Sequence, residues 1–396
     1  MLTPEYLVSV ADDVIDIYSE VEQDIINDIV RRIVKTGKLT ETAKWQLERA
    51  QAFGYFRQDV EKTLAKATGK SQKEIRRIMA EAGAKSLAYD DSIYLKAGLK
   101  PIPFSKSPAL QAMLLQGTSD VNALVSNFTK TTAISSQTAF IRVLDRAYIQ
   151  ILTGAFDPTT AIKRGINDLA QNGINKVAYP SGTSCTIEAA VRRAVITGLN
   201  QSVSKLQLER VKEMEWDLVE VTSHAGARPT HAVWQGKIYC VNGSTRHYGN
   251  LEEETGYGEG DGLCGWNCYH NFYPYLDGYS TPTFINDPSA DAGRDNDEDY
   301  EIQQKQRYYE RQVRAAKREC EAYNTAVEEA DDEGLAKEMY KSFQSASVKL
   351  KNREAKLKKF VTDNGITRYP EREWIGKWDR SVSGKAVWAN RKAKKR

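Results

Sequence analysis

Apolar residues recur at helical spacing through the first two hundred residues of the chain. Thr3 is a suitable N-cap residue, and Pro4 is suited to the first position of a helix. Glu5 is suited to the positive N-terminal end of the helix dipole. Gly37 indicates where this first helical pattern ends. The repeat between these signals is formed by Val14, Tyr18, Val21, Ile25, Ile29 and Ile33, and it predicts one amphipathic helical stretch.

Local boundary signals divide the following residues into more helices. Thr40 is expected to open a second helix, and Ser71 with Glu74 has the spacing of a capping box, which predicts the start of a third. Residues 97–108, AGLKPIPFSKSP, form a connector interrupted by prolines.

Three more helices are predicted before residue 215. One runs from about Ser119 to Thr153 and ends at Gly154. A second begins at Asp157–Pro158 and ends at Gly173, and a third runs from about Thr186 to Met214.

The pattern then changes to the alternation that is typical of strands. Residues 216–221 read WDLVEV and residues 237–241 read KIYCV, with turns rich in Gly, Asn and Asp around them. These features predict a small module with β-strands over residues 216–285.

The C-terminal part returns to helical spacing. Residues 286–300, NDPSADAGRDNDEDY, are acidic and lack apolar periodicity, which indicates a linker. A charged helical pattern follows to about Val361 and is interrupted by DDEG at 331–334, as in a helical hairpin. Trp374 and Trp378 follow Pro370, and the chain ends in NRKAKKR.

The expected fold class is therefore α+β and predominantly helical. Four consecutive parts are predicted: a helical body at 1–215, a His/Cys module at 216–285, an acidic linker at 286–300, and a charged helical extension with a basic tail at 301–396.

The His/Cys module is defined by its unusual composition. All four histidines and three of the five cysteines of the chain lie between His224 and His270. Imidazole and thiolate are the ligands that zinc prefers. The predicted zinc ligands are His231, Cys264, Cys268 and His270, with His224 as a substitute; Cys240 lies in an apolar alternation and is expected to be a core residue.

Two other interpretations of the module stay open at this point. His231 and Cys268 are equally suited to a buried, hydrogen-bonded cluster without metal. A thiol hydrolase with Cys268 as nucleophile and His231 as base is the enzymatic alternative, although neighbouring acids disfavour a thiolate. The glycine-rich run at 256–262 is not a phosphate loop, because its acids repel phosphate and no lysine follows.

Charge is strongly segregated along the chain. Residues 250–300 carry twelve acids and one base, whereas residues 301–396 carry fifteen acids and twenty-four bases. Such a basic segment suits contact with phosphates or with an acidic protein surface, and also suits a solvated helix. The candidate contacts are Lys349, Lys351, Arg353, Lys356, Lys358, Lys359, Arg391, Lys392, Lys394, Lys395 and Arg396.

Composition excludes other classes of protein. No run of about 18 apolar residues is present, so no transmembrane helix is expected. The N-terminus is acidic and amphipathic, unlike a secretory signal, and the odd number of cysteines suits a reducing cytosol.

Two motifs in the module resemble those of a known family, the phage minor capsid protein 2 family, which is related to the Mu-type minor head proteins. The first motif contributes His224, Gly226, Arg228, Pro229, His231, Trp234, Gly236 and Lys237, and the second Cys264, Gly265, Asn267, Cys268, His270 and Tyr273. Tyr269 departs from the pattern, since many relatives have a basic residue there.

The resemblance implies a minor head protein of a tailed bacteriophage. Its expected partners are portal and capsid proteins, to which the basic extension adds packaged double-stranded DNA as a candidate. Its expected location is the capsid interior or the portal, with assembly in the host cytoplasm. The expected roles are head morphogenesis, packaging or ejection, without an enzymatic activity. The alternatives are a virion-borne enzyme or toxin-like effector that uses the His/Cys cluster, and a DNA-binding protein that acts through its extension.

Overall fold

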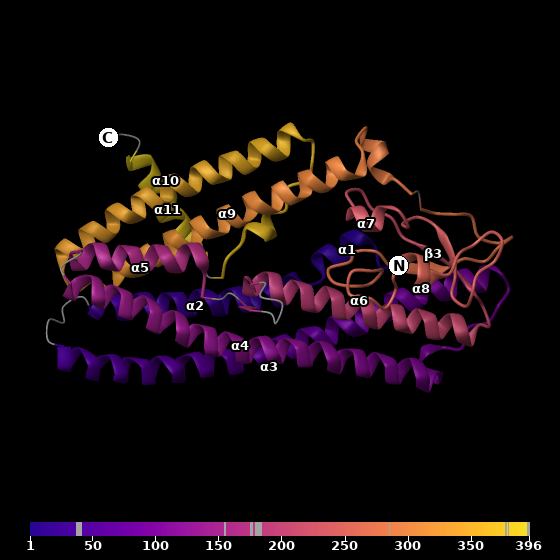
Figure 1. Ribbon diagram of the computed structural model, residues 1–396, viewed down its shortest axis with the longest axis horizontal. Coiled ribbons are helices and arrows are strands. Elements are labelled where there is room, and N and C mark those ends of the chain that lie inside the picture. The colour runs from indigo at the N-terminus through magenta and orange to yellow at the C-terminus, as the bar shows by residue number, and fades with distance from the viewer. Residues whose placement is uncertain are drawn as a thin grey trace. The chain divides into compact units, whose positions relative to one another are not determined.

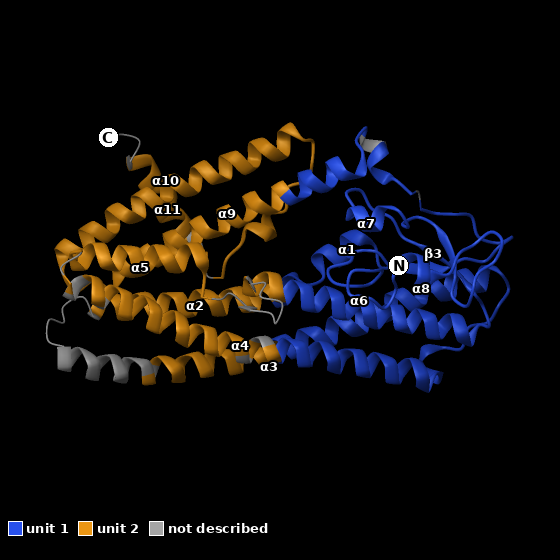
Figure 2. Ribbon diagram, viewed as in Figure 1, with its two compact units in different colours: residues 1–14, 71–126, 191–304 blue, residues 15–70, 127–190, 305–396 orange. Residues whose placement is uncertain are grey.

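The computed structural model describes residues 1–36, 42–153, 156–174, 177–178, 184–284, 286–376, 378 and 380–393. They form two compact units, each assembled from three separate stretches of chain (Figure 2). Unit 1 comprises residues 1–14, 71–126 and 191–304, and unit 2 comprises residues 15–70, 127–190 and 305–396. The boundaries between the units fall inside helices, and each unit combines stretches that are not consecutive in sequence. The four parts suggested by the sequence are consecutive, and their boundaries stay a prediction.

Helices make up most of the described residues, and the expected α+β class with predominant helix is confirmed (Figure 1). Before residue 215 the elements are α1 (Pro4–Ser9), α2 (Asp12–Thr36), α3 (Thr42–Lys96), η1 (Phe104–Lys106), α4 (Pro108–Leu152), α5 (Pro158–Asn172), the short strands β1 (Val177–Ala178) and β2 (Ser184–Cys185), and α6 (Ile187–Glu213). After it come β3 (Leu218–Val221), α7 (Pro229–Ala232), β4 (Ile238–Cys240), α8 (Leu251–Thr255), β5 (Phe272–Pro274), η2 (Pro288–Ala292), α9 (Asn296–Glu328), α10 (Glu333–Asp363), η3 (Pro370–Glu373) and α11 (Arg380–Ala393).

Several of the predicted helix ends are confirmed. The Thr3 hydroxyl accepts a hydrogen bond from Tyr6 N and caps α1. Asp157 caps α5, and Gly173 ends it with φ of 63°, a conformation that favours glycine. The signals expected at Gly37, Thr40 and Gly154 lie outside the described residues.

The capping box predicted at Ser71 and Glu74 was wrong. Both residues lie inside the continuous helix α3, where Ser71 is buried. The Glu74 carboxylate pairs instead with Arg77, one turn further along the helix. A capping box is only a local preference, and the apolar helical face continues across it from Ala67 to Ile75 and Ile78, all of which are buried.

Unit 2 has its own apolar core. The buried face of α2 supplies Ile25, Ile29 and Ile33, and residues from α3, α4, α5, α9, α10 and α11 join the cluster. Helices α9 and α10 lie side by side (Figure 1), and Lys349 of α10 pairs with Glu319 of α9. The helical hairpin expected around residues 331–334 is thereby confirmed.

The predicted linker at 286–300 was wrong in its local structure. It contains η2 and the first residues of α9. The Asp295 carboxylate accepts a hydrogen bond from Glu298 N, 2.7 Å away, and the acids at 297–299 occupy the first turn. Negative charge favours the N-terminus of a helix, so the same acidic residues that indicated a linker support a helix start.

The His/Cys module of unit 1 is built on a three-stranded antiparallel sheet in the order β4-β3-β5. The strands predicted around 216–221 and 237–241 are confirmed as β3 and β4, whereas β5 was not foreseen. Val219 pairs with Tyr239 on one side of β3, and Glu220 pairs with Tyr273 on the other.

Helix α6 supplies much of what holds this module. Val211 belongs to the same apolar cluster as Val219 and Phe272. The buried Asn200 side chain donates to Cys268 O and His270 O, at 3.2 and 2.8 Å. Its oxygen accepts from Asn271 Nδ2 at 2.7 Å. One amide therefore fixes the whole segment from residue 268 to residue 271.

Replacing Asn200 by Ala should destabilise unit 1 by about 2–4 kcal/mol, because the substitution leaves buried polar groups of the 268–271 segment without partners. The midpoint of urea unfolding, followed by tryptophan fluorescence, measures the effect. Lys205→Ala, an exposed substitution on the same helix, is the control and should leave the midpoint nearly unchanged. Equal midpoints for the two variants would contradict the tethering role of Asn200.

Candidate functional site

Two short segments bring the most distinctive residues of the chain together inside the module. The single-turn helix α7 begins with Pro229 at its first position and carries His231. The loop that leads into β5 carries Cys268 and His270. All three side chains are almost completely buried, with at most 2% of the surface of each exposed.

The three side chains point ligand atoms at one another. His231 Nδ1 lies 3.8 Å from Cys268 Sγ, and His270 Nδ1 lies 3.6 Å from the same sulfur. The three atoms all lie within 4.8 Å of one another, close enough to hold a metal ion. The cluster thus contains two imidazoles and one thiol, a donor set that suits zinc.

The opposite nitrogen of each imidazole meets an oxygen. His231 Nε2 lies 2.7 Å from Asp261 O, and His270 Nε2 lies 2.8 Å from Gln235 Oε1. Gln235 Oε1 also accepts a hydrogen bond from His224 N at 3.1 Å. These contacts hold both rings in place with their Nδ1 atoms toward the sulfur.

The glycine-rich run at 256–262 is a tightly packed turn that positions Asp261 O for this contact. Gly256 ends α8 with φ of 63°. A Cβ on Gly262 would lie 1.9 Å from Gly256 O, so no side chain fits there. Backbone conformation at Gly256 and close backbone packing at Gly262 thus explain these two glycines.

Burial without a bound cation favours the neutral form of every member. Desolvation lowers the pKa of His231 to about 4 and that of His270 well below its usual value. Desolvation also raises the pKa of Cys268 to about 11. A buried thiol with a raised pKa is a weak nucleophile, so the geometry gives little support to Cys268 and His231 as a hydrolase pair.

The other His and Cys residues occupy separate places. Cys264 is buried, but its Sγ contacts His270 O at 3.7 Å and it is not among the three clustered ligands. The His224 ring stacks on His270, with 4.4 Å between ring centres. Cys240 is a buried residue of β4, as expected from its apolar alternation, and His247 is exposed.

Trp234 and Gln235 are members of the site that sequence reasoning missed as functional residues. The Trp234 ring centre lies 4.6 Å from that of His231 and 4.8 Å from that of His270. Both residues lie within four positions of His231 in the sequence, and Trp234 also belongs to the first family motif; these were the signals that could have indicated them.

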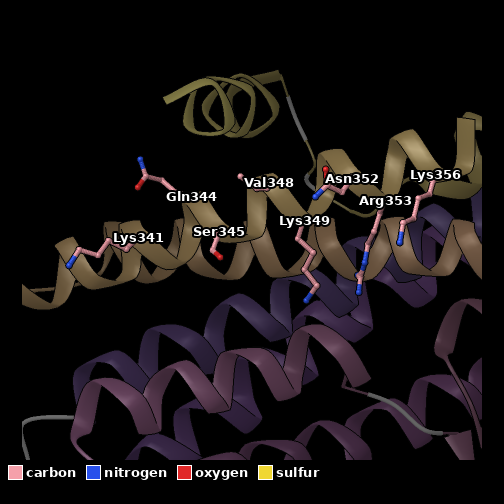
Figure 3. Close-up of a pocket in the computed structure, with 8 residues that line it drawn as sticks. All are labelled: Lys341, Gln344, Ser345, Val348, Lys349, Asn352, Arg353 and Lys356. Carbon is pink, nitrogen blue, oxygen red and sulfur yellow. The ribbon is translucent and has the colours of Figure 1, made fainter. Parts of the chain in front are cut away.

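The second candidate site is the basic surface of α10. Figure 3 shows an open pocket along this helix, in which Lys349, Arg353 and Lys356 extend toward the same side. Lys349 pairs with Glu319 at 2.6 Å, and Arg353 donates to Gln312 O at 2.7 Å, so these two bases have partners within unit 2.

The remaining predicted contact residues are placed as follows. Exposed positions are occupied by Lys351, Lys356, Lys358, Lys359, Arg391 and Lys392, whereas Lys394, Lys395 and Arg396 lie outside the described residues. Lys359 pairs with Asp363, and Lys392 lies over the Trp388 ring.

None of the helices in the described part of the chain is long and apolar enough to cross a membrane.

Comparison with known proteins gives a consistent family. A protein of Lactococcus phage LL-H, described as a structural protein, is 27% identical over 243 residues, which cover 59% of this chain and 62% of the relative. A structural protein of Lactococcus phage mv4 is 34% identical over 123 residues, which cover 31% of this chain and 88% of that protein. The chain thus spans less than two thirds of the length of the LL-H protein, and no solved structure matches.

The family described as phage minor capsid protein 2 matches residues 2–362, nearly the whole chain. The match includes the His/Cys module, nearly all of unit 1 and most of unit 2, and it confirms the resemblance seen in the two motifs. The chain is therefore a phage structural protein that belongs to the phage minor capsid protein 2 family.

Proposed function

We propose that this protein is a low-copy component of the phage head that contacts the portal and capsid proteins from the capsid interior. The observation that carries the proposal is the family match over residues 2–362, joined by two relatives described as structural proteins. A part in head assembly, DNA packaging or ejection follows from such a position.

The chemistry of the module favours a structural role over catalysis. A nucleophile must reach its substrate, whereas Cys268 and His231 are almost fully buried. Without a bound cation, burial also raises the pKa of Cys268 to about 11 and so disfavours a free thiolate at neutral pH. A virion-borne hydrolase or toxin-like effector is therefore the weaker candidate.

Purified heads should contain the protein at a small fraction of the level of the major capsid protein. Quantitative mass spectrometry of mature and precursor heads measures the ratio, and cross-linking within intact heads identifies its neighbours, among which portal peptides are expected. Absence of the protein from both kinds of head would show that it is not a head component. A level equal to that of the major capsid protein would show that it is not a low-copy component.

Contact with packaged DNA is a second candidate function, and the exposed bases of unit 2 favour it. Lys351, Lys356 and Lys358 are exposed on α10, and Arg391 and Lys392 are exposed on α11. Each phosphate contact releases condensed counterions, so such binding requires no base-specific contact. The competing interpretation is a solvated helical surface, or a docking arm that uses the exposed Trp374 and Trp388.

The full-length chain should bind duplex DNA without sequence preference, and the affinity should fall steeply between about 50 and 200 mM salt. Replacing Lys351, Lys356 and Lys358 by Gln should make the logarithmic salt dependence shallower, by up to about 0.9 for each contact removed. Deleting residues 391–396 should act in the same direction. Fluorescence anisotropy with labelled duplexes of two unrelated sequences gives the measurement.

The matched control for this experiment replaces Lys62, Lys66 and Lys70, which are exposed on α3, by Gln. This control changes the net charge equally but leaves the proposed surface intact, so its salt dependence should equal that of the unmodified protein. Equal slopes for the two triple variants, or no binding near 50 mM salt, would dismiss the DNA contact and favour the docking arm.

A further inference from the structure

We propose that His231, Cys268 and His270 bind one zinc ion through Nδ1, Sγ and Nδ1, with Cys264 outside the donor set. This assignment differs from the four-ligand set suggested by the sequence. It concerns the folding of the module and does not depend on the role of the protein in the head.

The cluster has too few protons to pair all of its nitrogen and sulfur atoms with one another, and this shortage favours a bound cation. Asp261 O is a backbone carbonyl and has no proton, so His231 Nε2 must donate in that contact. His231 Nδ1 then carries a lone pair, and this lone pair faces Cys268 Sγ.

The tautomer of His270 is fixed in the same way as that of His231. Gln235 Oε1 already accepts from the backbone N–H of His224, and this donor fixes the orientation of the amide. A reversed amide would place its NH₂ group against that N–H, donor against donor. His270 Nε2 therefore donates to Gln235 Oε1, and His270 Nδ1 also presents a lone pair to the sulfur.

One thiol cannot satisfy both lone pairs. The Cys268 S–H has a single proton, whereas both Nδ1 atoms face the Cys268 sulfur. Without a cation, one of the two buried nitrogens therefore receives no proton from the sulfur, and an unpaired buried acceptor is unfavourable. A zinc ion bound by the thiolate would accept electron pairs from all three atoms, and the Cys268 proton would leave to solvent.

The two distances from the sulfur to the nitrogens also fit a zinc ion. With Zn–S of about 2.3 Å and Zn–N of about 2.0–2.1 Å, a tetrahedral site places its sulfur about 3.6 Å from each nitrogen. The observed separations are 3.8 and 3.6 Å. The oxygens on the two Nε2 atoms match the usual surroundings of zinc-bound histidine, whose second nitrogen donates to a carbonyl or a similar acceptor.

Cys264 is excluded from the proposed zinc ligands because of where its sulfur lies. Its sulfur contacts His270 O at 3.7 Å instead of joining the three clustered atoms. The fourth position of the ion would then be filled by a ligand from outside the protein, such as water.

The first measurement is the metal content of the full-length protein purified without chelator, which should hold about one zinc per chain. Cys268→Ser should lose the zinc, because it removes the only thiolate of the set. Cys264→Ser and Cys240→Ser are matched controls, since both replace buried thiols of the same module, and both should keep the zinc.

A second measurement covers the case in which Cys268→Ser does not fold. The unmodified protein is treated with a chelator and then titrated with Co²⁺, which should give the absorption of a tetrahedral thiolate complex in both the unmodified protein and Cys264→Ser. Chelation should lower the unfolding temperature, and adding Zn²⁺ should restore it, because metal binding stabilises only the folded module.

Two results would overturn the proposal. Folded, unmodified protein that holds no zinc and gives no cobalt absorption would show that the cluster is a hydrogen-bonded core. Loss of zinc and of the cobalt absorption in Cys264→Ser, while Cys240→Ser keeps both, would show that Cys264 is a ligand and that the three-donor assignment is wrong.

Discussion

The His/Cys module depends on the amide of Asn200. A three-stranded sheet of such short strands cannot bury a sufficient core alone, so it uses a helix as its support. Helix α6 contributes the apolar Val211 and two amides at helical spacing from it that meet backbone carbonyls of the loop and of β5: Asn200 at Cys268 and His270, and Gln207 at Phe272. Buried backbone carbonyls need such partners, and the partners also fix where Cys268 and His270 lie.

Buried polar contacts also connect the helices within unit 2. Arg318 is buried between Glu22 and Glu188, and Asn27 donates to Glu321. Burial raises the pKa of Glu22, while Arg318 lowers it. Removing one member of such a group would leave a buried charge without its partner, so these contacts are expected to specify which helix faces meet as well as to stabilise the packing.

The places of the reactive and charged side chains in the structure agree with a structural role for the protein. The His and Cys groups with catalytic potential are buried, whereas the charged groups that reach solvent on α10 and α11 are mainly cationic. Buried His and Cys residues are suited to hold a small module together, and exposed Lys and Arg residues are suited to meet phosphates or acidic protein surfaces. The importance of the module would then lie in its contribution to the stability of a phage structural protein.

Sequence alone was sufficient to predict the helical body, several helix ends, two strands of the sheet, the clustering of His and Cys, and the family. These features rest on interactions between neighbours in the chain: Asp157 caps the helix that directly follows it, and Gly173 ends that helix with its own backbone conformation. The two family motifs are likewise contiguous stretches of chain, so the order of residues is enough to identify them.

The remaining features depend on tertiary contacts. Ser71 and Glu74 have the right local spacing for a helix start, but the apolar face that packs on either side of them keeps α3 continuous. Cys264 and Cys268 look like paired ligands in sequence, yet the loop turns the Cys264 sulfur toward a carbonyl and leaves Cys268 between two imidazoles. The contacts that position the two imidazoles join His270 to Asn200 and Gln235, and His231 to Asp261 O, over separations of 70, 35 and 30 residues. Hydrogen bonds between such distant residues leave no periodic trace in a sequence.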